Sequence, residues 1–222
     1  MLTPFAEDLW VVARRVRFFG LETGTRMTVV RLADGGLFIH SPVALDAELR
    51  AAIDTLGPVR AVVAPSRFHH LHVGDWLRAY PDAVYGGCPG LAKKRPDLAF
   101  HLVLGDRPHE RWAADLQQVY FSARREDEVD FYHPKSRTFI CADALLNLST
   151  HDYASTRFVA GLMGNSAPGL GWMEPLMVRD RRVARREVDR MLEWDFDKVV
   201  LAHGALLEAD GKTALRAAYA WL

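Results

Sequence analysis

The sequence predicts a mixed α/β protein in which two β-sheets lie between outer layers of helices. Three observations lead to this fold class. The apolar pattern changes repeatedly between the alternation typical of strands and the three- and four-residue spacing typical of helices. Strand patterns come first, and two successive series of alternating strands and helices follow. No linker or low-complexity segment divides the chain, so we expect a single domain that covers residues 1–222.

The first half of the chain accounts for the larger set of predicted strands. Strands are expected over residues 9–12, 16–19, 26–33, 37–40, 59–64 and 83–85. The Asp-Gly-Gly turn at residues 34–36 predicts a hairpin. Ser41 has the pattern of a helix N-cap, with Pro42 at the first helical position and Gly57 at the end of that helix.

The second half continues the alternation and adds a second hairpin. Strands are expected over residues 101–104, 118–121 and 198–202, and helices over residues 183–194 and 215–222. The hairpin covers residues 128–143, and a turn centred on Lys135 places Asp127 opposite Asp143. Residues 144–182 are expected to be helical, with breaks rich in Gly and Pro at 161–175.

Composition and charge exclude several classes of function. The chain has 28 basic and 28 acidic side chains, which argues against a general nucleic-acid partner. The arginines of residues 179–190 alternate with acidic residues on an amphipathic helix, so we expect a solvated face there. No apolar run is long enough for a membrane span, and the N-terminus lacks a signal-peptide pattern. Cys88 and Cys141 lie in apolar surroundings and are expected to be reduced. We therefore expect a cytoplasmic protein that acts on a small-molecule substrate.

Three histidines stand close together in the loop that follows the predicted strand at residues 59–64. His69, His70 and His72 occupy three of four consecutive positions. Imidazole nitrogen is a common ligand of zinc and iron, and a loop allows two rings to converge on one ion. The alternative is a solvated cluster that caps the next helix.

Two further candidate ligands stand at the ends of predicted strands. Asp143 follows the apolar residues 138–142, and His203 follows residues 199–202. A carboxylate in such surroundings is costly unless it is paired, hydrogen-bonded or bound to a metal. The alternatives are that Asp143 caps a following helix and that His203 is a hydrogen-bonded histidine at a strand end. Their joint position at carboxyl ends of strands, where open α/β sheets place their sites, favours a functional site.

Several longer stretches have the residues of a known family. They are GTRMTVV at 24–30, GLFIHSP at 36–42, FHHL at 68–71, GDW at 74–76, FYHPKSRT at 131–138 and WDFDK at 194–198. With these stretches the sequence resembles the metallo-β-lactamase fold superfamily and, within it, the bacterial branch DUF4336, a domain of unknown function. The resemblance extends over nearly the whole chain. It implies a four-layer αββα sandwich with a metal site at one edge of the two sheets.

The sequence departs from the ligand pattern of that superfamily. Its first metal motif reads His-x-His-x-Asp-His, and alignment on Gly74 leaves Arg67 and Leu71 in place of one histidine and the aspartate. Neither side chain has a lone pair for a metal. His69, His72, Asp143 and His203 remain as candidate ligands. The superfamily's mid-chain histidine has no counterpart, and Glu128 in the acidic stretch 126–128 is a possible substitute; a solvated acidic turn is the alternative.

Together with this resemblance, these residues predict a metal-dependent hydrolase whose site has fewer ligands than usual and holds a single ion. One zinc or iron ion would act on an ester, thioester, lactone or amide, because it polarises a carbonyl and activates water. Asp143 would be ligand and proton acceptor, while Arg67 would hold substrate charge or neutralise a nearby carboxylate. The alternative is a catalytically silent member that binds a small anion or a partner protein. Redox chemistry at iron is a third and less favoured hypothesis. Trp172 and Trp221 are candidates for a homodimer surface, a substrate wall or the core.

Overall fold

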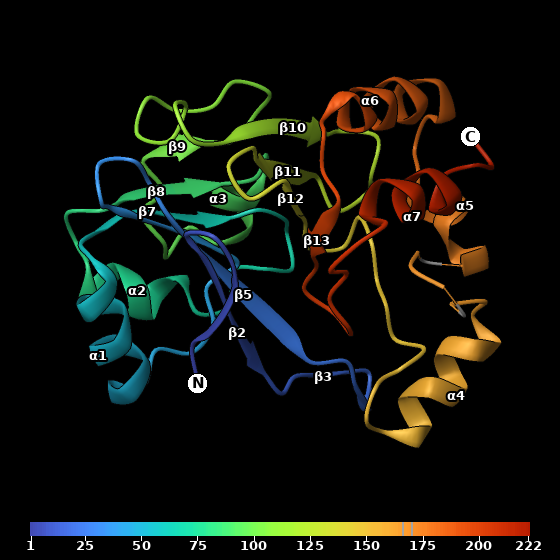
Figure 1. Ribbon diagram of the computed structural model, residues 1–222, viewed down its shortest axis with the longest axis horizontal. Helices are drawn as coiled ribbons and strands as arrows, with labels where there is room; N and C mark the ends of the chain where they lie inside the picture. The colour runs from blue at the N-terminus through green and yellow to red at the C-terminus, as the bar shows by residue number, and fades with distance from the viewer. Residues whose placement is uncertain (166, 170) are drawn as a thin grey trace.

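The computed structural model of the chain describes residues 1–165, 167–169 and 171–222, and it contains two facing β-sheets (Figure 1). The larger sheet has the strand order β1-β2-β5-β6-β7-β8-β9. These strands are Thr3–Ala6, Leu9–Arg14, Thr25–Arg31, Leu37–His40, Val59–Ala64, Val84–Gly87 and Leu102–Val103. The first four strands pair antiparallel, and β6 to β9 are parallel. The carboxyl ends of β6 and β7 therefore lie at the same edge of the sheet.

The smaller sheet has the order β10-β11-β12-β13. Its strands are Gln117–Phe121, Glu128–His133, Thr138–Ile140 and Lys198–Val200. Strands β12 and β13 are parallel, so the chain segments that follow them leave the sheet side by side. A separate two-stranded ribbon consists of β3 (Arg17–Phe18) and β4 (Leu21–Glu22).

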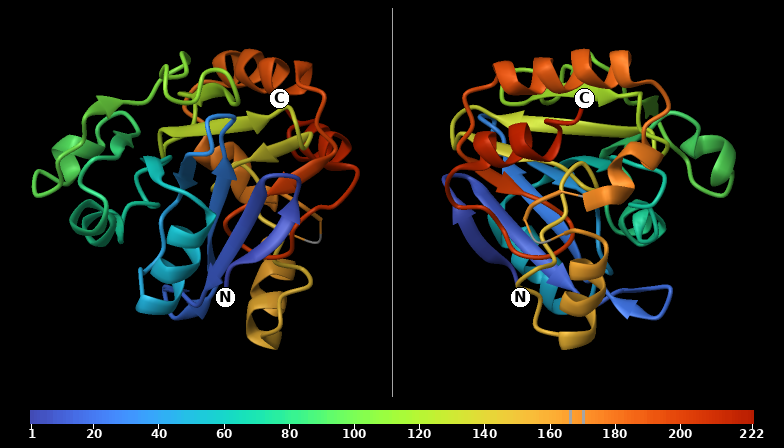
Figure 2. Two further views of the ribbon diagram at one scale, coloured as in Figure 1. Left: turned by 60° about the vertical axis from the view of Figure 1, so that its left-hand side comes forward. Right: turned by 90° about the vertical axis from the view of Figure 1, so that its right-hand side faces the viewer.

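Helices cover the outer faces of both sheets (Figure 2). Helices α1 (Ala47–Leu56), α2 (Val73–Ala79) and α3 (Leu91–Lys94) pack on the larger sheet, where Ile53 and Trp76 are buried. Helices α6 (Arg181–Glu193) and α7 (Gly211–Ala218) pack on the smaller sheet. Between the sheets, the rings of Phe38 and Phe131 lie 5.2 Å apart within a third apolar cluster. The four layers confirm the predicted αββα sandwich.

Residues 144–182 contain helical segments with breaks, as the sequence predicts. The described segments are α4 (Ala154–Leu162), a 3-10 turn at Gly171–Met173 and α5 (Glu174–Met177). Within the predicted break, Ser166 and Leu170 lie outside the described residues. No helix in the described ranges combines the length and the apolar character that a membrane span needs.

The predicted start of the first helix is wrong. The helix begins at Ala47, and the N-cap is Asp46, whose carboxylate accepts a hydrogen bond from the Leu49 amide at 2.8 Å. Ser41 lies instead directly after β6 with φ at 56°. Its hydroxyl is therefore available to another part of the molecule, namely the His69 ring described below.

The register of the second hairpin differs from the prediction by one residue. Phe131 pairs with Ile140, and His133 pairs with Thr138 rather than with Arg137. The turn is one residue longer than predicted, and this shift places Glu128 rather than Asp127 beside Asp143. Because side chains alternate between the faces of a strand, the shift changes which acidic group lies next to the candidate ligand.

Candidate metal centre

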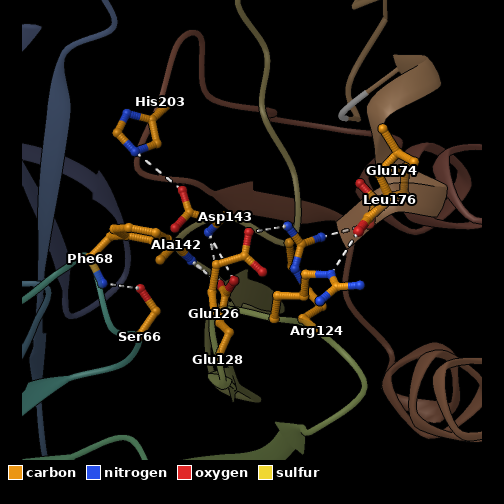
Figure 3. Close-up of polar contacts among 12 residues, drawn as sticks. Ser66, Phe68, Arg124, Glu126, Glu128, Ala142, Asp143, Glu174, Leu176 and His203 are labelled. Carbon is orange, nitrogen blue, oxygen red and sulfur yellow. Dashed lines mark hydrogen bonds and ion pairs between the residues drawn. The ribbon is translucent and has the colours of Figure 1, made fainter. Parts of the chain in front are cut away.

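Three side chains from separate loops come together at one edge of the two sheets. His69 follows β7, Asp143 follows β12 and His203 follows β13. One ligand atom of each lies within 4.8 Å of the others. The Nε2 of His69 is 3.4 Å from Oδ2 of Asp143. The Nε2 of His203 is 3.3 Å from Oδ1 of the same carboxylate (Figure 3). The carboxylate therefore lies between two imidazoles that point toward it.

The outer nitrogens of both imidazoles are held by hydrogen bonds. The Nδ1 of His203 donates to the carbonyl oxygen of Gly24 at 2.7 Å. Since a carbonyl can only accept, this bond fixes the hydrogen on Nδ1 and leaves the lone pair of the neutral ring on Nε2. The Nδ1 of His69 lies 2.7 Å from the Ser41 hydroxyl. Such outer partners are typical of metal-binding histidines, because they fix the tautomer and orient the ring.

The charges at this centre depend on one another. Burial raises the pKa of Asp143, but the two imidazoles outweigh it and hold the pKa well below the ordinary value. Burial likewise opposes a charged His69, yet the Asp143 carboxylate raises the pKa of that imidazole. Oδ2 of Asp143 is buried and has no hydrogen bond among the described residues. A positive charge between these groups is therefore favoured, either as a proton or as a cation.

Glu128 binds the backbone of Asp143 rather than joining the group of candidate ligands. Its buried carboxylate accepts hydrogen bonds from the Ala142 amide at 2.6 Å and from the Asp143 amide at 2.9 Å (Figure 3). Both oxygens are engaged, because the second also accepts from Asp143 at 3.1 Å. The structure thus places this candidate ligand against the backbone and outside the His69–Asp143–His203 group.

The other two histidines of the loop have separate partners. His72 lies at the start of α2, and its Nδ1 is 3.4 Å from Oδ2 of Asp75. The Nδ1 of His70 is 2.9 Å from the Arg95 guanidinium. The structure therefore brings only His69 of this loop to the group.

Arg67 neutralises an acidic neighbour other than Asp143. Its guanidinium lies 2.9 Å from Oδ2 of Asp127, and Arg179 binds the same carboxylate at 2.9 and 3.1 Å. The Tyr120 hydroxyl donates to it at 2.8 Å. The pKa of Asp127 is lowered by these partners even though burial raises it. The sequence left two roles open for Arg67, holding substrate charge or neutralising a nearby carboxylate, and the structure shows the second.

A buried charged network lies behind Asp143 (Figure 3). Arg124 is fully buried and contacts Glu174 at 2.7 Å, the Tyr219 hydroxyl at 2.8 Å and Glu126 at 3.4 Å. Burial raises the pKa of Glu174 to about 7, while Arg124 acts in the opposite direction. No motif predicts this network, because Glu174 and Tyr219 are distant in sequence from Arg124.

The groups that orient the two imidazoles were likewise not predicted from the sequence. Ser41 was assigned to a helix cap, although its place directly after a strand is the signal that singled out Asp143 and His203. Gly24 acts through its backbone carbonyl, which no side-chain pattern can reveal. Arg26 donates to the carbonyls of Leu201 and Gly204, the latter at 2.7 Å, and so holds the loop around His203.

Solved structures of metallo-β-lactamases are similar to this chain over its whole length. A metallo-β-lactamase from Pontibacter korlensis has a TM-score of 0.70 and 12% identity, covering 99% of this chain and 97% of its own. One from Hirschia baltica has a TM-score of 0.69 and 11% identity, and the similarity covers 99% of this chain and 96% of that protein. One from Pseudomonas aeruginosa in its mono-zinc form has a TM-score of 0.67 and 12% identity, covering 100% and 94%.

These similarities define the class: the chain has the metallo-β-lactamase fold. More narrowly, residues 6–89 match the family described as "Domain of unknown function (DUF4336)", in agreement with the branch that the sequence motifs indicate. No curated protein is similar to the sequence at a significant level.

Proposed function

We propose that this protein is a metal-dependent hydrolase that holds one divalent ion, zinc or iron, with His69, Asp143 and His203. One observation carries the proposal. The Gly24 carbonyl leaves a lone pair on Nε2 of the neutral His203 ring, and this lone pair faces the Asp143 carboxylate at 3.3 Å. Two acceptors in this position repel each other unless a proton or a metal ion lies between them, and we propose that the metal ion occupies this position. Two imidazole nitrogens and a carboxylate oxygen form a donor set typical of catalytic zinc sites.

The proposed reaction is hydrolysis of an ester, thioester, lactone or amide. A bound divalent ion would lower the pKa of a water molecule and polarise the substrate carbonyl. Asp143 orients both imidazoles and offers a carboxylate that can accept a proton, and Glu128 fixes its backbone. Arg67 and Arg179 share the single carboxylate of Asp127, so one positive charge remains for an anionic substrate, and the side chain of Arg67 is 42% exposed. A single ion is favoured because Arg67 and Leu71 stand where two further ligands would be needed.

The first test is the metal content of protein purified without a chelator, measured by plasma mass spectrometry. We expect about one equivalent of zinc or iron in the wild type, and a loss of most of it in both His69→Ala and His203→Ala. His72→Ala is the matched control, because this imidazole belongs to the same loop but contacts Asp75. It should retain the wild-type metal content.

Two results would contradict the proposal. One is less than about a tenth of an equivalent of metal in the wild type even after incubation with zinc or iron. The other is equal metal loss in His72→Ala and His69→Ala. The first result would favour the second candidate function, a catalytically silent protein that binds a small ligand. The observation behind this candidate is that Arg67 replaces a ligand and forms an ion pair with Asp127.

A further inference from the structure

We infer that a cleft beside the His203 loop binds the oxyanion group, phosphate or carboxylate, of a small molecule. The cleft has a volume of about 470 Å³, which falls within the range of small-molecule sites. Its walls are the carboxyl end of β2, the amino end of β5 and the β3–β4 ribbon. The loop at residues 150–153 and the loop after β13 complete the lining. Its lining does not include His69, Asp143 or His203, so the inference goes beyond the proposed function.

Arg26 is the proposed anchor of this site. Its partly buried guanidinium lines the cleft and donates to the carbonyls of Leu201 and Gly204. Burial lowers the pKa of Arg26 to about 10, and no carboxylate of the described residues offsets this effect. A guanidinium that is withdrawn from water without a carboxylate partner carries a positive charge that an entering anion can neutralise.

Two further arginines, Arg14 and Arg15, line the cleft. Arg15 lies over the ring of Tyr153 at 5.2 Å from its centroid, and Arg14 binds Asp46 at 2.9 Å. Guanidinium groups suit oxyanions because their planar donors match two oxygens at once.

Two carboxylates also line the cleft, Glu22 and Asp152. Glu22 is already shared by Arg15 at 3.5 Å and Arg17 at 3.8 Å, and it accepts from the Val16 amide at 2.9 Å. Asp152 is exposed. Among the charged residues that line the cleft, Arg26 is therefore the partly buried one whose described contacts are backbone carbonyls rather than a carboxylate.

The cleft shares its wall with the candidate metal centre. Gly24 and Gly204 both line it, and the Gly24 carbonyl accepts the hydrogen bond from His203. Arg26 binds the backbone on both sides of that histidine. An anion bound to Arg26 would therefore contact the backbone segments that hold His203, namely those around Gly24 and Gly204.

The test is calorimetric titration of metal-free protein with inorganic phosphate and, separately, with acetate. Metal-free protein removes any binding through an ion, so this test is independent of the proposed hydrolase. We expect saturable binding of one anion per chain for at least one of the two probes, and the tighter probe identifies the preferred oxyanion. Arg15→Gln should weaken this binding about tenfold, since a charge-assisted hydrogen bond contributes roughly that much.

Arg17→Gln is the matched control. Its side chain is 68% exposed against 69% for Arg15, and both contact Glu22, but Arg17 does not line the cleft. It should change the dissociation constant less than about twofold. Arg26→Met should abolish binding, with urea unfolding used to confirm that this variant is folded. Absence of binding by the wild type to both anions, or equal weakening by Arg15→Gln and Arg17→Gln, would overturn the inference.

Discussion

The carbonyl of Gly24 determines the tautomer of His203, although glycine has no side chain. Because this oxygen can only accept, Nδ1 must carry a hydrogen, and in the neutral ring Nε2 faces Asp143 as a lone pair. The Ser41 hydroxyl is less restrictive, since it can donate to His69 or accept from it. The two histidines therefore differ: the neutral ring of His203 has one tautomer, and the ring of His69 can change its tautomer without losing its partner.

A substitution at Glu128 tests how far the backbone of Asp143 depends on a buried carboxylate. Glu128→Gln places an amide group where two backbone N–H groups need acceptors, so we expect a loss of about 1–3 kcal/mol in the free energy of unfolding. We also expect zinc affinity to fall roughly tenfold to a hundredfold, as for other outer partners of ligands. Competition with a chromophoric chelator measures the affinity.

Glu187 offers a matched control for that variant. Its buried carboxylate also accepts from two backbone amides, those of Ser122 and Ala123, at 3.2 and 3.0 Å. Glu187→Gln should therefore lose a comparable amount of stability and keep the wild-type zinc affinity. A zinc affinity that falls equally in both variants would show a general effect of destabilisation rather than positioning of Asp143.

At the scale of elements, the loop after β13 depends on close contact with the loop after β12. Gly204 has φ at 95°, and a Cβ there would collide with the carbonyl oxygen of Asn147. The Asn147 amide donates to the His203 carbonyl at 3.0 Å, and the Ala205 amide donates to the Asn147 carbonyl at 2.9 Å. The two loops that carry Asp143 and His203 are thereby joined to each other by their backbones.

Gly204→Ala should consequently be severely destabilising. We expect a loss of more than about 2 kcal/mol in urea unfolding, because the substitution adds both backbone strain and a collision. Gly161→Ala is the control, since Gly161 lies in α4 and its Cβ would meet no atom within 4 Å. This control should gain about 0.5–1 kcal/mol through lower backbone entropy of the unfolded chain. Equal stability of the two variants would contradict the role of the Gly204 contact.

The elements themselves were largely predictable from their apolar periodicity. Strands β6 and β7 have the predicted bounds, and β5, β10 and α6 lie within a few residues of their predicted positions. Strand β1 and the short helix α3 were missed, because each has only four residues, too few to produce a clear period. The candidate ligands at strand ends could be found for the same reason, since an abrupt change from apolar to polar residues marks the end of a strand.

The remaining part of the candidate centre could not be predicted from local patterns. The role of Glu128 depends on the length of a turn, and the one-residue error in register assigned its place to Asp127. Arg67 pairs with Asp127, 60 positions further along the chain, through an approach that only the packing of two loops creates. Periodicity locates strands and their ends, whereas such contacts follow from how the loops fold over the edge.

At the scale of the whole molecule, the buried network around Arg124 joins the smaller sheet to the segment after α4. It contains Glu126, Glu174 and Tyr219, each at most 5% exposed. Breaking a buried pair leaves an uncompensated charge, which costs about 3–5 kcal/mol. The network therefore makes the position of α5 dependent on charge as well as on packing.

Stability should depend on pH through Glu174. Its folded-state pKa of about 7 lies above the ordinary value of 4.5, so the folded protein binds a proton that the unfolded chain releases. The resulting stability is fully present below pH 4.5 and is lost as the pH rises to 7, by on the order of 3 kcal/mol. Urea unfolding at several pH values measures this change. The Glu174→Gln variant should lack this decline; an unchanged decline would assign it to other groups.

The three candidate ligands come from both halves of the sandwich, His69 from the larger sheet and Asp143 and His203 from the smaller one. An ion bound by all three would act as a non-covalent crosslink between the sheets. Since such an ion binds the folded chain better than the unfolded one, it adds about 2.7 kcal/mol to the free energy of unfolding at a hundredfold excess over its dissociation constant. The concentration of free metal would then determine part of the free energy that holds the two sheets together.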